Sequence, residues 1–419
     1  MNTYQNTMFG VEKFTFFISL PWRETNGLLN DFRAYRKIDK HLKEPQPMGE
    51  RKTFQMIDGT PYQVHTLHRI AYDDSVVRGV RWTLKRNDCN NDSIIEATIN
   101  PRKLLGENHT SPASDGSYFD RIVEAYNSLA VKISPLLRDF KCYKTKGVVP
   151  CISFDLEELG YPCSVEQMMY LITQGDIPGG YEDRYSHTEG CKNRFYLEPK
   201  TKSGKEGRLT ISCYSKYQQL SKESSDHHRL ETSKNLINFE VECKYSKVYS
   251  DLRKLAETKI LYNKSSEYVI MSNPISEFEI TRELLSDHMS KYVLLNEFNR
   301  TIMGGDFHTL ENAVEIIDSI KTCSSRRALM TWALELVKDC HGVYNAKQRF
   351  ENEREEAIKS GDKEAAQRAL LDSSRLYRAL GHLKNNDISP VTIPIEWNIS
   401  YMPGLLKAYQ AFTNPHNLK

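Results

Sequence analysis

The feature that most constrains the fold of this chain is a change of hydrophobic periodicity near residue 280. Before it, runs rich in β-branched and aromatic residues predict strands at 12–20, 78–86, 93–101, 150–157, 208–216 and 235–244. Two segments between them, 120–140 and 164–174, have apolar residues at helical spacing. Ser164 and Gln167 form the pattern of a helix-capping box at the start of the second. The pattern predicts helices packed on a sheet.

After residue 280 the helical spacing dominates. Helices are predicted at 280–298, 309–320 and 324–339, then over a long charged run at 346–380, and a last strand at 392–399. We therefore predict an α+β fold with two domains, at residues 1–275 and 276–419, the second mainly α-helical and with a possible DNA-binding role. No low-complexity linker separates them.

Composition narrows the class of protein. The chain has 57 Lys and Arg against 55 Asp and Glu, so any affinity for DNA must come from local basic patches. Nine cysteines without a CxxC pair predict reduced thiols and no zinc ribbon. The sequence has no run of about 18 apolar residues and no signal-peptide pattern. We therefore expect a cytoplasmic protein without a membrane partner.

Candidate chemistry comes from acids inside apolar strands and from one tyrosine. Glu96, Asp155 and Glu240 each interrupt an apolar strand pattern, where an unpaired acid is costly. Tyr214 and Lys216 form a Tyr-x-Lys motif near the end of another strand. Carboxylates suit Mg²⁺ or Mn²⁺, which can polarise a phosphodiester for attack by a tyrosine oxygen. A nearby lysine can lower the tyrosine pKa or stabilise the developing charge. Equally, each acid can face water on its strand and the tyrosine can serve packing alone.

An ordered set of motifs resembles a known family. The segments are IIEATINPRKLLGEN (94–108), SLAVKISPLLRDF (128–140), CISFDLEEL (151–159), LTISCYSKYQQL (209–220) and LINFEVECKYSKVYSDLRKL (236–255). In this order they resemble the filamentous-phage gene II/X-type replication initiation proteins of phages and plasmids. The resemblance covers about residues 75–255 and extends more loosely toward the C-terminus.

The resemblance implies a rolling-circle replication initiator, a site-specific DNA nicking-closing enzyme that forms a 5′-phosphotyrosyl intermediate. It implies that Tyr214 is the nucleophile and that Lys216 is its companion lysine. Asp155, Glu240 and Glu96 match the family's strand acids, to which we assign the Mg²⁺ or Mn²⁺ site on chemical grounds. The implied fold is a ferredoxin-like antiparallel sheet backed by helices, and the implied partners are origin DNA and a host helicase and polymerase.

Several positions depart from the family pattern. No arginine precedes the apolar-Asp pair that ends at Asp155, Gln219 replaces a glutamate, and Glu107 replaces a histidine. The His-hydrophobic-His metal motif of other rolling-circle nucleases is absent. Two alternatives therefore stay open, a non-catalytic DNA-binding replication or repressor protein and an unrelated metal-dependent hydrolase.

Two groups of residues are candidates for DNA contact. One follows the tyrosine and Phe-Glu strands and consists of Lys216, Lys244, Lys247, Arg253 and Lys254. The other lies near the C-terminus and consists of Arg375, Arg378, His382 and Lys384, with Tyr377 and Trp397 as stacking surfaces.

Overall fold

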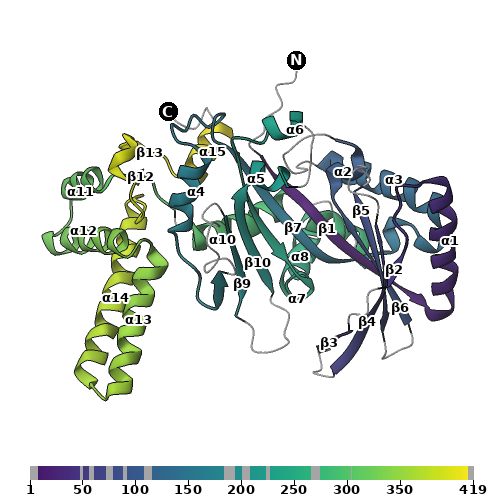
Figure 1. Cartoon of the computed structure of the whole chain (residues 1–419), viewed down its shortest axis with the longest axis horizontal. Coiled ribbons are helices and arrows are strands. Elements are labelled where there is room, and N and C mark those ends of the chain that lie inside the picture. The colour runs from purple at the N-terminus through teal and green to yellow at the C-terminus, as the bar shows by residue number, and fades with distance from the viewer. Residues whose placement is uncertain are drawn as a thin grey trace.

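The structure of the chain is a computed structural model (Figure 1). It describes residues 8–47, 51–55, 61–71, 79–87, 92–107, 116–183, 194–200, 208–222, 227–265, 274–302 and 304–413. Helices and a large antiparallel sheet make up the fold, so the predicted α+β class is confirmed. None of the helices in this described part is long and apolar enough to cross a membrane.

Within the described residues, eleven strands form one sheet in the order β2-β4-β5-β6-β1-β7-β11-β10-β9-β8, with β3 paired to β4. All the pairings in it are antiparallel. The strands are β1 (Met8–Pro21), β2 (Gln46–Pro47), β3 (Arg51–Gln55), β4 (Pro61–Ala71), β5 (Val80–Asn87), β6 (Asp92–Ile99), β7 (Lys144–Asp155), β8 (Tyr181–Asp183), β9 (Arg194–Pro199), β10 (Leu209–Ser215) and β11 (Leu236–Cys243). The six strands predicted from the sequence are confirmed with small shifts of their ends.

The first half of the sheet is built around β1, which lies between β6 and β7. Helix α1 (Thr25–Ile38) follows β1, and helix α3 (Gly116–Ile133) connects β6 to β7. Phe32 of α1 packs on Trp82 of β5 with ring centroids 5.5 Å apart, and Phe16 of β1 packs on Tyr126 of α3 at 5.0 Å. Both helices therefore cover the same face of the sheet, which we call the inner face.

The second half of the sheet is covered on the same inner face by α4 (Val165–Thr173), α9 (Glu277–Leu284) and α10 (Asp287–Thr301). Phe298 of α10 packs on Phe239 of β11 with centroids 5.1 Å apart and on Phe154 of β7 at 5.7 Å. The capping box predicted at Ser164 is present at the start of α4. Helices α9 and α10 follow the predicted domain boundary, yet they share the apolar core of the sheet.

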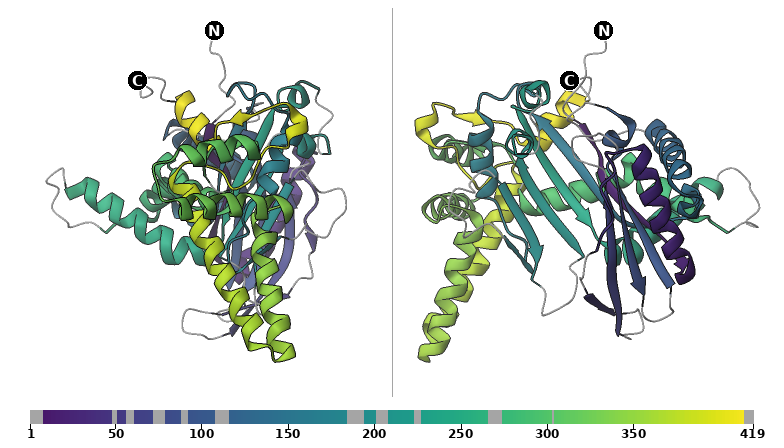
Figure 2. Two further views of the ribbon diagram at one scale, coloured as in Figure 1. Left: turned by 90° about the vertical axis from the view of Figure 1, so that its left-hand side faces the viewer. Right: turned by 45° about the vertical axis from the view of Figure 1, so that its right-hand side comes forward.

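The remaining C-terminal helices are α11 (Leu310–Ser319), α12 (Ser324–Asp339), α13 (Val343–Ser360), α14 (Lys363–Asn385) and α15 (Leu405–Thr413). The hairpin of α13 and α14 extends away from the sheet in Figures 1 and 2. The long helical run at 346–380 is broken between them because Gly361 adopts a left-handed conformation (φ 78°) and Asp362 caps the next helix.

The predicted strand at 392–399 is wrong. Ile395–Trp397 forms a 3₁₀ turn (η5) between Pro394 and Asn398, whose left-handed φ of 55° ends it. The strand pair in this region is instead β12 (Phe307–His308) with β13 (Tyr401–Met402).

Short elements complete the described chain. They are α2 (Pro101–Leu105), α5 (Lys216–Leu220), α6 (His227–Glu231), α7 (Tyr245–Lys247), the π-helical turn η4 (Val248–Leu252), α8 (Arg253–Ser265), and the 3₁₀ turns η1 (Trp22–Glu24), η2 (Pro135–Leu137) and η3 (Phe140–Cys142). Two of them, α2 and α5, supply side chains to the site described next.

Candidate functional site

The direction of the Tyr214 side chain follows from the alternation of side chains along strand β10. Cys213 points to the inner face, where it is fully buried and its Sγ lies 3.9 Å from Sδ of Met169 on α4. Because successive side chains of a strand point to opposite faces, Tyr214 points to the other, outer face. Tyr214 is therefore outside the apolar core that the helices cover.

The strand register brings polar side chains together on this outer face. Ser212 and Tyr214 of β10 lie opposite Glu240 and Asn238 of β11, and Glu240 in turn lies opposite Cys151 of β7. The Tyr214 hydroxyl donates a hydrogen bond to the carboxylate of Glu240, and Asn238 Nδ2 donates to the Tyr214 oxygen at 3.5 Å. The predicted nucleophile and one predicted acid are thus direct partners.

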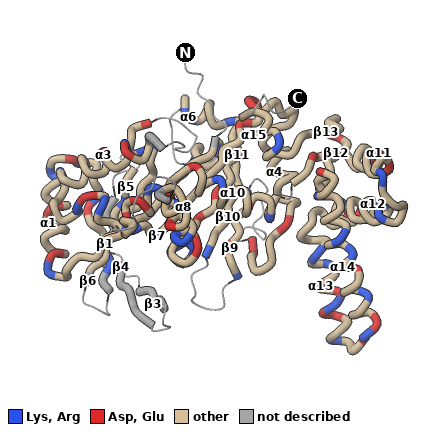
Figure 3. The backbone as a smooth tube through the Cα atoms, turned by 180° about the vertical axis from the view of Figure 1, so that it is seen from behind, with Lys and Arg blue, Asp and Glu red and all other residues tan. Residues whose placement is uncertain are grey.

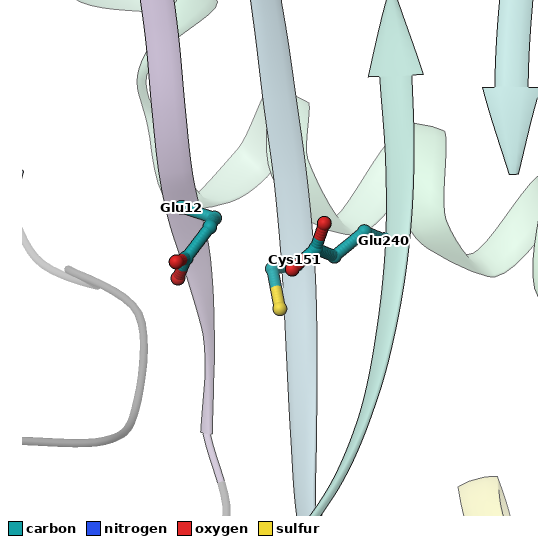
Figure 4. A group of neighbouring side chains, drawn as sticks. All are labelled: Glu12, Cys151 and Glu240. Carbon is teal, nitrogen blue, oxygen red and sulfur yellow. The ribbon is translucent and has the colours of Figure 1, made fainter. Parts of the chain in front are cut away.

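Glu12 joins this group from β1 because of a β-bulge. The register of β1 on β7 shifts between Val11 and Lys13, which leaves Glu12 as the extra residue. One ligand atom from each of Glu12, Cys151 and Glu240 lies within 4.8 Å of the others. Figure 4 shows the three side chains extending from three neighbouring strands on one side of the sheet, with a helix behind the sheet.

Lys216 is the main cation of the group. It is the first residue of α5, whose N-cap is Ser215, and its side chain folds back so that only 5% of the residue is exposed. Its Nζ lies 3.6 Å from a carboxylate oxygen of Glu12 and 5.8 Å from the centroid of the Tyr214 ring. Lys216 therefore contacts both the predicted nucleophile and the acid pair.

Burial and like charge set the protonation of the group. Burial and the nearby charge of Glu12 raise the pKa of Glu240. Burial disfavours the charged form of Glu12 and would raise its pKa. The positive charges of Lys216 and of Arg102 on α2 outweigh burial and hold the pKa of Glu12 below the ordinary value. Burial, followed by the charges of Glu240 and Glu12, raises the pKa of Tyr214 well above its usual range. The tyrosine is therefore protonated at neutral pH, contrary to the expectation that Lys216 lowers its pKa.

Cys151 is a buried thiol in the same group. Burial, with the charges of Glu240 and Glu12, raises its pKa well above the ordinary value. A neutral buried thiol is unreactive as a nucleophile. Cys151 is therefore not a candidate catalytic nucleophile, and only the position of its Sγ beside the two carboxylates makes it a candidate metal ligand.

Asp155 lies away from this group. It ends β7, four residues beyond Cys151, which is roughly 13 Å along a strand. Its Oδ1 accepts hydrogen bonds from the backbone N–H groups of Glu157 at 3.0 Å and Glu158 at 3.3 Å. Asp155 stabilises the turn that follows the strand.

Glu96 also lies away from it. Glu96 of β6 is opposite Phe17 of β1, five residues from Glu12, or roughly 16 Å along the strand. Its carboxylate pairs with Lys85 at 2.6 Å and with Lys146. The structure thus brings Tyr214, Lys216 and Glu240 together and leaves Asp155 and Glu96 apart.

Glu12 and Cys151 are the site residues that sequence reasoning missed. Glu12 carries the same signal as the other strand acids, a carboxylate in an apolar strand run, but it stands at the start of that run. Cys151 looks like a small core residue, and only the pairing of β7 with β11 brings it to the acids.

Chemically, the group offers a hydroxyl bonded to a carboxylate, a second carboxylate, a buried ammonium and a thiol. These can hold a cation between the acids, accept the tyrosine proton and stabilise an anionic phosphate. Comparisons of the chain with protein-family models, with curated proteins and with solved structures found no match.

Proposed function

We propose that the chain is a rolling-circle replication initiator that nicks and rejoins one DNA strand through Tyr214. The observation that carries the proposal is the hydrogen bond from the Tyr214 hydroxyl to Glu240, with Lys216 beside the ring. A tyrosine that only packs a strand needs neither an acid on its hydroxyl nor a buried lysine at its ring. The origin DNA is the proposed substrate, and a host helicase and polymerase are the proposed partners.

The reaction uses Glu240 as the base. As the Tyr214 oxygen bonds to phosphorus, the bond from phosphorus to the 3′-oxygen breaks and the tyrosine proton passes to Glu240. The leaving oxygen takes a proton from water and becomes the 3′-hydroxyl that primes synthesis. The Glu240 carboxylate already accepts the hydrogen bond of the Tyr214 hydroxyl, so it is placed to take this proton. Lys216 stabilises the charge on the phosphate oxygens.

The donor set of the site fits a divalent cation. Glu12 and Glu240 offer the hard oxygen ligands that Mg²⁺ and Mn²⁺ prefer, and the Cys151 thiol favours Mn²⁺ of the two. Held there, the ion would polarise the scissile phosphate. In this proposal Glu12 is a metal ligand together with Glu240, in place of Asp155 and Glu96, which the sequence analysis assigned to the metal site.

We further propose that β1 to β7 form a ferredoxin-like unit. Supporting this, the order β1-α1-β5-β6-α3-β7 along the chain becomes β5-β6-β1-β7 in the sheet, with both helices on one face. A β-α-β-β-α-β order with the first strand between the third and fourth is what the ferredoxin-like arrangement requires.

A metal-dependent hydrolase is the second candidate. The raised pKa of Tyr214 favours it, because a hydroxyl that resists ionisation can serve to orient Glu240 while water attacks the phosphate. The two candidates differ in one product, since only a tyrosine nucleophile leaves DNA covalently attached to the protein.

The proposal is tested by incubating the full chain with supercoiled DNA that carries candidate origins, in Mn²⁺. A protein–DNA adduct that survives denaturation, and that maps to Tyr214 after nuclease digestion and mass spectrometry, supports the nicking enzyme. Cleavage without an adduct supports the hydrolase. Specific binding of an origin without cleavage supports the DNA-binding alternative.

A further inference from the structure

An exposed cluster of aromatic rings forms around Phe17, which points to the outer face of β1 five residues beyond Glu12. The ring of Tyr245 packs against Phe17 of β1 with centroids 6.0 Å apart and against Tyr249 at 5.6 Å. Tyr245 is 38% exposed and Tyr249 is 44% exposed. Rings grouped at the surface in this way offer a stacking platform, whereas most exposed aromatics stand singly.

The local backbone explains why these rings face outward. The turn η4 places Val248 and Leu252 in the core, where both are buried. Tyr245 and Tyr249, four residues apart, then share the opposite side. The buried pair anchors the turn, so the platform is held by the fold.

Lysines surround the rings. Lys144 lies opposite Phe17 across β1 and β7, and Lys13 precedes Phe17 by four residues on the same face. Lys244 immediately precedes Tyr245. Within the described part of the chain, Lys13, Lys144 and Lys244 form no ion pair. Figure 3, which views the molecule from the side that α8 and α10 cover, shows lysine and arginine segments close to α8.

Acids lie near the rings as well as lysines. Asp251 is paired with Lys247 at 2.9 Å and with Arg208 at 2.6 Å, and Glu242 is on β11, opposite Thr210. The group of Glu96 with Lys85 and Lys146 lies beside Phe17 and adds a further net positive charge. Arg253, a sequence candidate for DNA contact, is instead held by Glu277 through two hydrogen bonds of 2.8 Å.

The platform is in line with the candidate site. Lys13 adjoins Glu12, and Phe17 is four residues farther, roughly 13 Å along β1. About four stacked nucleotides cover that distance at about 3.4 Å each. A strand with a phosphate beside Lys13 can therefore reach the rings.

We infer that Phe17, Tyr245 and Tyr249, with Lys13, Lys144 and Lys244, form a track for single-stranded DNA next to the candidate nicking site, which we call the stacking track. The rings select a single strand because a duplex keeps its base faces stacked on each other. The lysines bind the phosphates. The inference rests on the proposed function, since it names how that site holds its substrate strand.

The test measures binding by fluorescence anisotropy of a labelled oligothymidylate and of a duplex of equal length, with the full chain in a Tyr214→Phe background. Tyr249→Ala should weaken single-strand binding about tenfold, because one stacked base is lost. The double variant Lys144→Ala, Lys244→Ala should have a less negative slope of log affinity against log salt concentration. The slope should change by about 1.4, because each phosphate contact on a single strand contributes about 0.7. Tyr249→Phe keeps the ring and should bind as the parent does.

Two matched controls lie off the track. Tyr262 is 72% exposed near the far end of α8, which projects from the body of the molecule in Figure 2, and Lys359 is exposed near the end of α13. Tyr262→Ala and Lys359→Ala should change neither affinity nor salt dependence. Circular dichroism checks that each variant is folded.

Unchanged binding in Tyr249→Ala, or equal affinity for duplex and single strand, overturns the inference. Loss of binding in Tyr377→Ala and Lys384→Ala instead places the strand on the C-terminal helices and also overturns it. The adduct assay with Tyr214 present separates this result from the proposed function. If the track variants lose single-strand binding as expected but the parent forms no adduct, the nicking enzyme alone is refuted. If the parent forms an adduct but the track variants bind as the parent does, the track alone is refuted.

Discussion

At the scale of single residues, the role of each strand acid depends on the side chains that the neighbouring strands place beside it. Glu240 and Glu96 have the same signal in the sequence, yet one bonds to Tyr214 and the other to two lysines. The Tyr-x-Lys motif and the Phe-Glu strand predicted three members of the group. Tyr214 and Glu240 lie on strands whose alternation is readable, and Lys216 follows the end of β10 as the first residue of α5. Glu12 and Cys151 were not predictable, since their positions depend on a bulge and on the strand order.

We expect Glu240→Gln to slow nicking by roughly 10²- to 10⁴-fold, because it removes the proposed base while preserving shape. Glu242→Gln is the matched control, a glutamate two positions along the same strand and on the same face, and should nick normally. The measurement is the initial rate of conversion of supercoiled to open-circular DNA on a gel. Equal rates in the two variants would remove Glu240 from the mechanism.

The carboxylate of Glu96 should matter for stability and not for metal binding. Burial opposes its charge, but Lys146 and Lys85 hold its pKa below the ordinary value. Such a group stabilises the fold above its unfolded pKa of about 4.3 and loses that effect as the pH falls through the folded pKa. Glu96→Gln should therefore cost about 3 kcal/mol at pH 7, the lower end for a buried pair, since both lysines are partly exposed.

Urea unfolding at several pH values measures this cost. The difference between the parent and Glu96→Gln should be largest near neutral pH and should shrink below about pH 4. A difference that stays constant across that range would show that the charge of Glu96 contributes nothing.

At the scale of elements, the period of the apolar residues was enough to place the central strands and most helices. It missed α1, α8 and the strands β2, β3, β4, β8 and β9, whose patterns are brief or mixed with polar and charged residues. It also ran α13 and α14 together, because the helical spacing continues through the break at Gly361. The strand expected at 392–399 failed because Pro394 and Asn398 set a local turn.

Helix α10 is predicted to be part of the sheet's core and not of a separate helical domain. Phe298 is buried between Phe239 and Phe154, so Phe298→Ala should destabilise the chain by roughly 3–5 kcal/mol. The loss should appear in the unfolding of the sheet, followed by hydrogen exchange of β7 and β11 amides. Faster exchange limited to the part of the chain after residue 276, which includes α10, would instead support the domain boundary at 275/276.

At the scale of the whole molecule, strand order is what assembles the site, and one sequence does not reveal strand order. β1, β7, β11 and β10 are far apart along the chain but adjacent in the sheet, and each contributes one residue of the group. Helices α4, α9 and α10 cover the inner face of the sheet, and the polar group lies on the outer face.

The central claim is that Tyr214 is the nucleophile, and one comparison tests it most directly. Parent and Tyr214→Phe proteins are incubated with origin-bearing supercoiled DNA and Mn²⁺, then denatured and analysed for covalently attached DNA. The account predicts an adduct with the parent and none with Tyr214→Phe, while the two proteins bind single-stranded DNA equally, because only the hydroxyl is lost. An adduct that persists in Tyr214→Phe would contradict the account and would direct attention to Tyr217, which lies one residue beyond Lys216.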